Sequence, residues 1–199
     1  MDIPASLVKS LRDQTGAGMM ECKSALIEAK GNIEEATTIL RKRGLAQAAK
    51  KVGRSTSEGL IGSYIHAGGK IGVLVELNCE SDFVARTDDF QNLLKEVALQ
   101  VAAANPTYVR REDVPAEVLE REREIYRAQM AESGKPAAVI EKIIDGKLGA
   151  FYEQTVLVDQ ASIRDPKTTV QQLLQAAIAK LGENISVARF VRFKVREGI

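Results

Sequence analysis

In the stretch "LIGSYIHAGGKIGVLVELN", residues 60–78, the apolar residues no longer recur at helical spacing. Its two halves, "LIGSYIH" and "KIGVLVELN", have the composition that favours strands. The turn-forming "AGG" between them is a hairpin signal. The stretch therefore predicts two antiparallel strands in a chain whose other segments mostly follow the helical period.

The residues before this hairpin predict a small helical domain, residues 1–54. Apolar side chains recur there at helical spacing in three short segments: Leu7, Val8 and Leu11; Cys22, Ala25, Leu26 and Ala29; Ile33, Ala36, Ile39 and Leu40. We expect Asn32 to cap the third helix and Gly44 to end it, after the basic turn 41–43. Beyond residue 52 basic residues give way to Gly, Ser and Thr, which predicts a linker.

After the hairpin the chain predicts four helices and a final strand. The helical segments are an apolar one from Phe90 to Val101, then 115–130, 136–154 and 168–182, with Thr168 as the expected cap of the last. In the final strand, Val191, Phe193 and Val195 share one face, and Arg192, Lys194 and Arg196 share the other, which we expect to be solvated. The predicted class is α+β, with residues 55–199 forming a small antiparallel β-sheet flanked by helices.

Charge and hydropathy exclude some classes of partner. The 199 residues hold 28 Lys and Arg against 27 Asp and Glu, which gives no strong attraction to nucleic acid or to an anionic membrane. No apolar run approaches the roughly 20 residues that a membrane-spanning helix needs. The N-terminal "MDIPASLVKSLRDQTG" lacks the apolar stretch of a signal peptide, so we expect a cytoplasmic protein.

Residues for catalysis or metal binding are few. Two cysteines, Cys22 and Cys79, and one histidine, His66, make a poor disulfide or zinc set. "GAGMMECKS" lacks the glycine that a phosphate loop needs before its lysine. A cysteine enzyme with Cys79 as nucleophile and His66 as base is an alternative, but the neighbouring Glu80 and Asp82 would raise the thiol pKa. We expect no enzyme, no cofactor and no metal site.

The stretch "NCESDFVAR", residues 78–86, places a phenylalanine where the chain should leave the core. Phenylalanine is usually buried, so on residue statistics Phe83 would pack on the following helix near Phe90. The alternative is that Phe83 points outward and is offered to a partner. A similar choice applies to Met19 and Met20, since methionine fills cores and also serves at adaptable binding surfaces.

Two stretches decide between these alternatives. "LRDQTGAGMMECKSAL", residues 11–26, and "ELNCESDFVAR", residues 76–86, resemble the two signatures of the elongation factor Ts family, in the same order. The similarity continues through residues 64–78 and through "RFVRFKV" at 189–195, and it covers essentially the whole chain.

The resemblance implies a nucleotide exchange factor for the GTPase elongation factor Tu. It implies that residues 1–54 form a three-helix module like a ubiquitin-associated domain. In the family, the residues matching Ser81, Asp82, Phe83 and Val84 enter beside the magnesium and phosphate site of the GTPase. Those matching Arg12, Met19 and Met20 contact its nucleotide domain. We keep His66 as a further candidate contact.

The chain departs from the family pattern in two ways. Ser81 stands where the family usually has threonine, which keeps the hydroxyl. One hairpin leads straight into the second signature, as in short members of the family, some of which dimerise. The final strand offers no cysteine, so a homodimer of this chain would have to be non-covalent. The competing hypothesis is a polypeptide-binding adaptor built on the N-terminal module.

Overall fold

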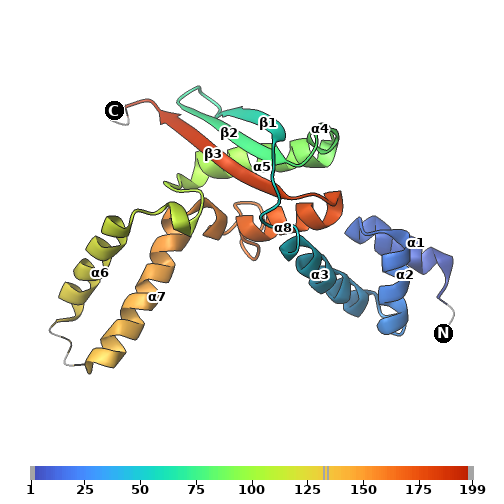
Figure 1. The fold of residues 1–199 in the computed structure, drawn as a ribbon, viewed down its shortest axis with the longest axis horizontal. Helices are drawn as coiled ribbons and strands as arrows, with labels where there is room; N and C mark the ends of the chain where they lie inside the picture. The colour runs from blue at the N-terminus through green and yellow to red at the C-terminus, as the bar shows by residue number, and fades with distance from the viewer. Residues whose placement is uncertain (1–2, 132, 134, 197–199) are drawn as a thin grey trace. The chain divides into compact units, whose positions relative to one another are not determined.

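The computed structural model describes residues 3–131, 133 and 135–196 (Figure 1). These residues form an α+β fold, as predicted. The elements in chain order are α1 (Ala5–Thr15), α2 (Met19–Glu28), α3 (Ile33–Ala49), β1 (Glu58–Ile65), β2 (Ile71–Cys79), α4 (Asp82–Ala85), α5 (Asp88–Ala104), η1 (Arg111–Asp113), α6 (Ala116–Met130), α7 (Ala137–Thr155), η2 (Leu157–Asp159), α8 (Val170–Leu181) and β3 (Ile185–Lys194).

The hairpin predicted at residues 60–78 is present and forms two strands of the sheet. The His66 amide donates to the Ile71 carbonyl and closes the hairpin, and Gly68 and Gly69 have the positive φ that its turn needs. The strand order is β1-β2-β3. Because Val195 pairs with Lys70 while Arg189 meets Glu76, β3 runs antiparallel to β2. The predicted antiparallel sheet is therefore confirmed for the described residues.

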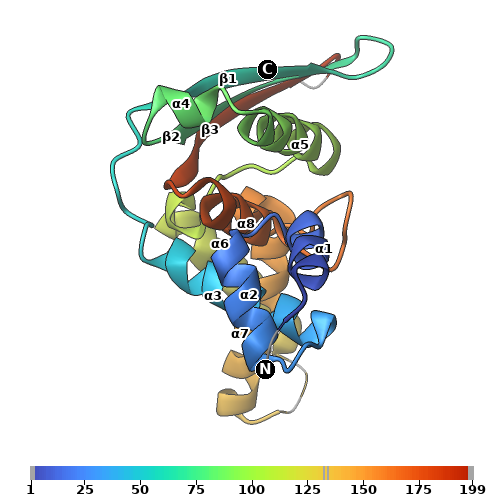
Figure 2. The same cartoon turned by 90° about the vertical axis from the view of Figure 1, so that its right-hand side faces the viewer.

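Helix α5 covers one face of the sheet (Figure 2). A Cβ at Gly62 in β1 would lie 2.5 Å from Cγ of Leu94, so only glycine permits this close approach. The Arg192 side chain donates to the Ala102 carbonyl in α5. The prediction of a solvated basic face on β3 is therefore wrong at Arg192, and on the opposite face Phe193 is 68% exposed. The sequence correctly predicted which residues of β3 share a face. It did not predict which of the two faces is covered, because residue type does not say on which side a helix packs.

The chain divides into two compact units. The first unit comprises Met1–Gly59, Asn78–Gln91 and Leu173–Ser186, and the second comprises the remaining segments. Strands β2 and β3 each run from one unit into the other. The domain boundary expected between residues 54 and 55 stays a prediction.

Helices α1, α2 and α3 bury most of the apolar positions that the helical spacing predicted, and Leu7, Ile33 and Ile39 pack against them partly buried. Leu11, Cys22, Leu26 and Ala36 are fully buried in one cluster. Asn32 caps α3 as expected, since its side-chain oxygen accepts the amide of Glu35 at 3.1 Å.

Gly44 does not end α3, which continues to Ala49. A Cβ at Gly44 would lie 3.1 Å from Cβ of Ala179 in α8. The glycine therefore marks a close approach of two helices within the first unit, and the prediction of a helix end there is wrong. The linker expected near residues 53–57 follows the longer helix.

The cap of α8 is one residue later than predicted. The Thr169 hydroxyl accepts the amide of Gln172, whose side chain accepts the amide of Thr169 in return. Thr168 instead donates its hydroxyl to Asp165. The reciprocal pair is a capping box, which satisfies two amides at the helix start.

Helices α6 and α7 pack on each other as an antiparallel pair in the second unit (Figure 1). Arg127 in α6 pairs with Glu141 in α7 and with Glu120, and these carboxylates raise the pKa of its guanidinium. Helix α6 buries no residue fully, so its surface is mostly solvated. Among the described residues, no helix is both long enough and apolar enough to cross a bilayer.

Candidate partner-binding site

The turn that carries Phe83 begins where β2 ends. Cys79 is the last residue of the strand, and Ser81 has extended backbone angles immediately before the single helical turn α4. The Asp82 carbonyl accepts the Arg86 amide, which closes this turn. The segment that follows β2 is thus a short helix attached almost directly to the central strand.

Phe83 points away from the protein. Its side chain is 78% exposed, whereas the next two residues, Val84 and Ala85, are buried. Neighbouring helix positions point about 100° apart, so one turn can bury Val84 and Ala85 while it projects Phe83. Phe90 is fully buried, and the alternative in which Phe83 packs into the core beside it is excluded. Val84 anchors the turn and has little surface to offer a partner.

Asp82 is paired within the same short segment. Its carboxylate accepts a hydrogen bond from the Arg86 guanidinium at 2.7 Å, four residues on. Both side chains are exposed enough that such a pair contributes only about 0.3–0.5 kcal/mol. The carboxylate can therefore change partner at small cost. Arg86 was not predicted as a site residue, although an acid four residues before an arginine was the available signal.

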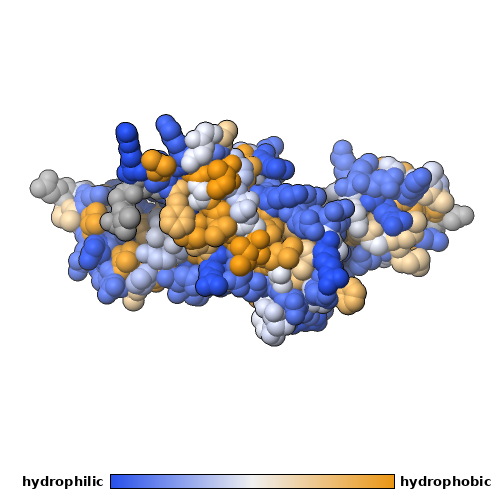
Figure 3. All heavy atoms as spheres, turned by 90° about the horizontal axis from the view of Figure 1, so that it is seen from above, coloured by the Kyte–Doolittle hydropathy of each residue, from blue (hydrophilic) through white to orange (hydrophobic). Residues whose placement is uncertain are grey.

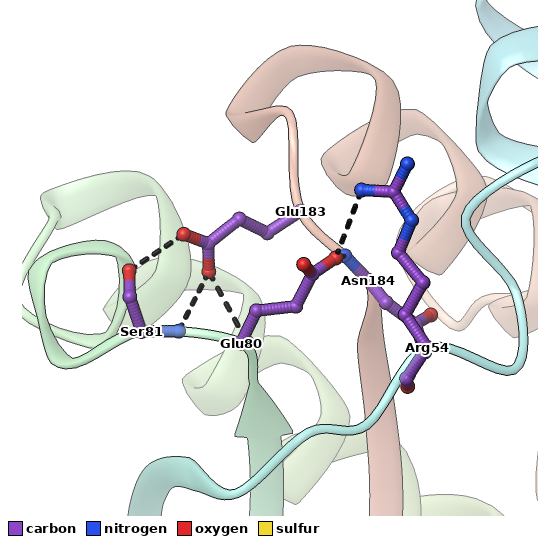
Figure 4. Close-up of polar contacts among 5 residues, drawn as sticks. All are labelled: Arg54, Glu80, Ser81, Glu183 and Asn184. Atoms are coloured by element: carbon purple, nitrogen blue, oxygen red, sulfur yellow. Dashed lines mark hydrogen bonds and ion pairs between the residues drawn. The ribbon is translucent and has the colours of Figure 1, made fainter.

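Glu183 holds the start of the turn (Figure 4). Its carboxylate accepts the amide of Ser81 at 2.9 Å, the amide of Glu80 at 3.1 Å and the hydroxyl of Ser81 at 2.5 Å. Glu183 lies between α8 and β3, about a hundred residues later in the chain than its partners. Nothing in the sequence signals this pairing, and Glu183 was not predicted as a site residue.

Glu80 makes the reciprocal contact (Figure 4). Its carboxylate accepts the amide of Asn184 at 2.6 Å and lies 3.6 Å from the Arg54 guanidinium. The Asn184 side chain donates to the Arg54 carbonyl at 2.8 Å. Residues 80–81 and 183–184 are therefore joined by hydrogen bonds to a carboxylate on each side. Arg54, which follows α3, contacts both Glu80 and Asn184.

Cys79 is unsuited to nucleophilic chemistry. It is fully buried, and its thiol donates to the Ser81 carbonyl at 3.1 Å. Burial raises the pKa of the thiol, and the charge of Glu183 raises it further. The sequence predicted a raised pKa but attributed it to the wrong acids. His66 lies beyond the opposite end of β2, where its ring bonds the Tyr64 hydroxyl, so the structure forms no pair with Cys79.

The other candidate contacts lie on the first two helices and on the hairpin. Arg12 is exposed on α1, and Met19 and Met20 are 48% and 75% exposed at the start of α2. Residue type alone left core and surface open for these methionines, and both side chains face outward. His66 is also exposed. In the part of the chain that the structure describes, no three His, Cys, Asp or Glu side chains gather as metal ligands would.

Comparison with known proteins identifies the family. A family profile described as elongation factor TS matches residues 4–197. The chain belongs to the elongation factor Ts family. Elongation factor Ts of Caldanaerobacter subterraneus subsp. tengcongensis is 60% identical over 99% of this chain and 98% of its own length. Elongation factor Ts of Fervidobacterium nodosum is 59% identical, and the match spans 99% of this chain and all of that protein.

A third relative extends the range of lengths. Elongation factor Ts of Geobacter sulfurreducens is 58% identical over this whole chain, which spans 92% of that protein. These elongation factor Ts relatives match the chain over nearly its whole length. The similarity therefore extends well beyond the two signatures. Membership assigns the chain to translation elongation in protein biosynthesis.

Proposed function

We propose that this protein promotes GDP release from the GTPase elongation factor Tu in the cytoplasm. The observation that carries the proposal is the exposed Phe83 on a short helical turn whose preceding residues, Glu80 and Ser81, are hydrogen-bonded to Glu183. An isolated exposed aromatic is unremarkable, but this one lies on the family's second signature. The N-terminal Arg12, Met19 and Met20 supply a further contact surface, and His66 is an additional candidate.

The mechanism is differential binding. Burying the Phe83 ring in a groove of the GTPase would contribute about 2 kcal/mol. This contribution promotes release only where the groove is open in the nucleotide-free form and closed in the GDP form. Asp82 would lie near the magnesium ion, whose octahedral oxygen shell tolerates little displacement. Displacing the groups that hold the ion would weaken the binding of the ion and then of GDP. The factor is unchanged by the cycle, so no covalent step is needed.

A polypeptide-binding adaptor remains the competing function. It would use the apolar surface at Met19 and Met20, but it gives no role to the exposed Phe83. An adaptor would also bind its partner without regard to nucleotide. An exchange factor must show coupling, because binding free energies between two ligands of one protein are reciprocal.

The coupling gives a direct expectation for binding. Because GDP with magnesium and this protein each weaken the other's binding, the protein should bind nucleotide-free elongation factor Tu at least about a hundredfold more tightly than the GDP–magnesium form. Titration calorimetry on the two forms measures the ratio. Equal affinities for the two forms would contradict exchange and favour the adaptor.

The outer face of the sheet supports a second association, with another copy of this chain. Ile61, Ile65, Leu74, Val191 and Phe193 are all exposed on the three strands. Figure 3 shows apolar side chains gathered on the face seen from above. Two such faces can pack against each other as in a β-sandwich, where apolar side chains of facing sheets interdigitate. We propose a non-covalent homodimer through this face.

Replacing Val191 and Phe193 together by serine should dissociate the dimer. Removing two apolar side chains from each of two facing sheets weakens association by roughly a hundredfold or more. Sedimentation velocity over a concentration series measures the change. The double variant Val139→Ser and Ile125→Ser, at exposed positions of α7 and α6, is the control and should associate like wild type. A wild type that is monomeric throughout the series contradicts the dimer.

A further inference from the structure

We propose that Glu183 is a positioning residue for nucleotide exchange. Resting on the proposed function, the inference is that Glu183 holds residues 80–81 so that α4 presents Phe83 outward. Glu183 acts through Ser81 and Glu80 and itself touches neither the nucleotide nor the partner.

The geometry of the hydrogen bonds makes Glu183 a clamp on the backbone (Figure 4). One carboxylate oxygen accepts two successive amides, those of Glu80 and Ser81, and the other accepts the Ser81 hydroxyl. Two successive amides bound to one oxygen fix the backbone orientation at the junction between β2 and α4. Hydrogen bonds to an ionised acceptor are the stronger kind, and here the groups are only partly exposed.

The turn needs such a clamp because α4 cannot hold itself. It has four residues, and helices far longer than this are only marginally stable alone. The Ser81 side chain, which would usually cap such a turn, makes no cap bond to it and bonds Glu183 instead. The direction in which Phe83 projects is therefore set from outside the helix, by Glu183 and by the burial of Val84 and Ala85.

Glu80 and Asn184 complete the clamp from the other side. Glu183 accepts the amide of Glu80, and Glu80 accepts the amide of the residue after Glu183. The hydrogen bonds join the entry to α4 with the entry to β3 within the first unit. A segment bonded in both directions is pre-ordered, so the partner need not supply the free energy for ordering it.

Amide hydrogen exchange by NMR tests the clamp itself. In Glu183→Ala the amides of Glu80 and Ser81 should exchange about tenfold faster than in wild type, since they lose their acceptor. The amide of Val75, in the sheet core, should be unchanged. Glu183→Gln should stay close to wild type, because its amide oxygen still accepts both backbone amides and its NH₂ can donate to the Ser81 hydroxyl.

GDP release from elongation factor Tu tests the consequence of the clamp. If Glu183 sets the fraction of molecules with a competent turn, Glu183→Ala raises the concentration for half-maximal acceleration by about tenfold and leaves the maximal rate unchanged. Glu183→Gln restores the wild-type value. Glu117→Ala, at an exposed position of α6, is the matched control and has no effect. General destabilisation would instead speed the exchange of Val75 as well.

Three results would overturn the proposal. If wild type accelerates GDP release but Glu183→Ala leaves the exchange of the Glu80 and Ser81 amides unchanged, the positioning role is overturned and the exchange function stands. Faster exchange at Glu80 and Ser81 with unchanged GDP release shows that the turn is held but that its position does not matter. A wild type that fails to accelerate release removes the exchange function and the positioning role together, and the amide data still show whether Glu183 holds the turn.

Discussion

Replacing Phe83 by alanine is expected to lower the acceleration of GDP release from elongation factor Tu by about 30-fold. The ring is 78% exposed, so its free energy of burial, about 2 kcal/mol, is available to a partner and is not used in the fold. Stopped-flow release of a fluorescent GDP, with the factor at a concentration below half-saturation, measures the change. Phe83→Leu should lose less, since most of the apolar surface remains.

The control for this variant removes exposed apolar surface elsewhere. Ile125 in α6 is also exposed, and the Ile125→Ala variant should accelerate GDP release from elongation factor Tu as much as wild type does. Equal losses in Phe83→Ala and Ile125→Ala would mean that the effect is general, and no loss in Phe83→Ala would mean that the ring is not the working contact.

Phe90→Ala is expected to act through stability. Phe90 lies seven residues after Phe83, in α5, and is completely buried. Removing a buried phenylalanine loses its transfer free energy and leaves a cavity, which together cost about 3–5 kcal/mol. Many natural domains have a total stability of only about 5–15 kcal/mol, so the urea midpoint should fall steeply. Equilibrium unfolding in urea followed by circular dichroism measures it.

The comparison of the two phenylalanines separates binding from folding. Phe83→Ala should change the free energy of unfolding by no more than about 0.5 kcal/mol, as expected for an exposed position. Should Phe83→Ala instead destabilise the protein as much as Phe90→Ala, the ring would be packed in solution and could not be the contact for a partner.

Local patterns predicted much of the fold. The hairpin follows from two strand-like segments around "AGG", and the faces of α1, α2 and α3 follow from apolar spacing. These features depend on residues close in sequence. Gly44 was misread because the same residue type ends helices and also permits close packing, and only Ala179 on α8 distinguishes the two.

In the candidate site, too, some residues could be predicted and others depend on contacts between residues far apart in the sequence. The exposure of Phe83 was expected from the resemblance, whereas residue statistics alone favoured burial. Glu183 and Asn184 could not be found, because about a hundred residues separate them from Ser81 and Glu80 and an isolated acid carries no signal of a distant amide. Arg192 was misjudged for a related reason, since its partner carbonyl belongs to α5.

The site therefore combines a stable base with an exposed tip. Val84 and Ala85 are buried, the base is bonded through Glu183 and Glu80, and the tip exposes Phe83 beside an Asp82 whose pairing with Arg86 is weak. Such an arrangement limits the conformations of the ring before binding and leaves the carboxylate able to change partner. Both properties suit the contact that we propose with the GTPase.

The most direct measurement is the release of fluorescent GDP from magnesium-loaded elongation factor Tu as wild-type protein is titrated in. Release should accelerate with concentration, reach a plateau, and slow again when free magnesium is raised, because magnesium and the factor oppose each other. A release rate that stays at its spontaneous value across the whole titration would contradict the exchange function, whatever the similarity of the sequences.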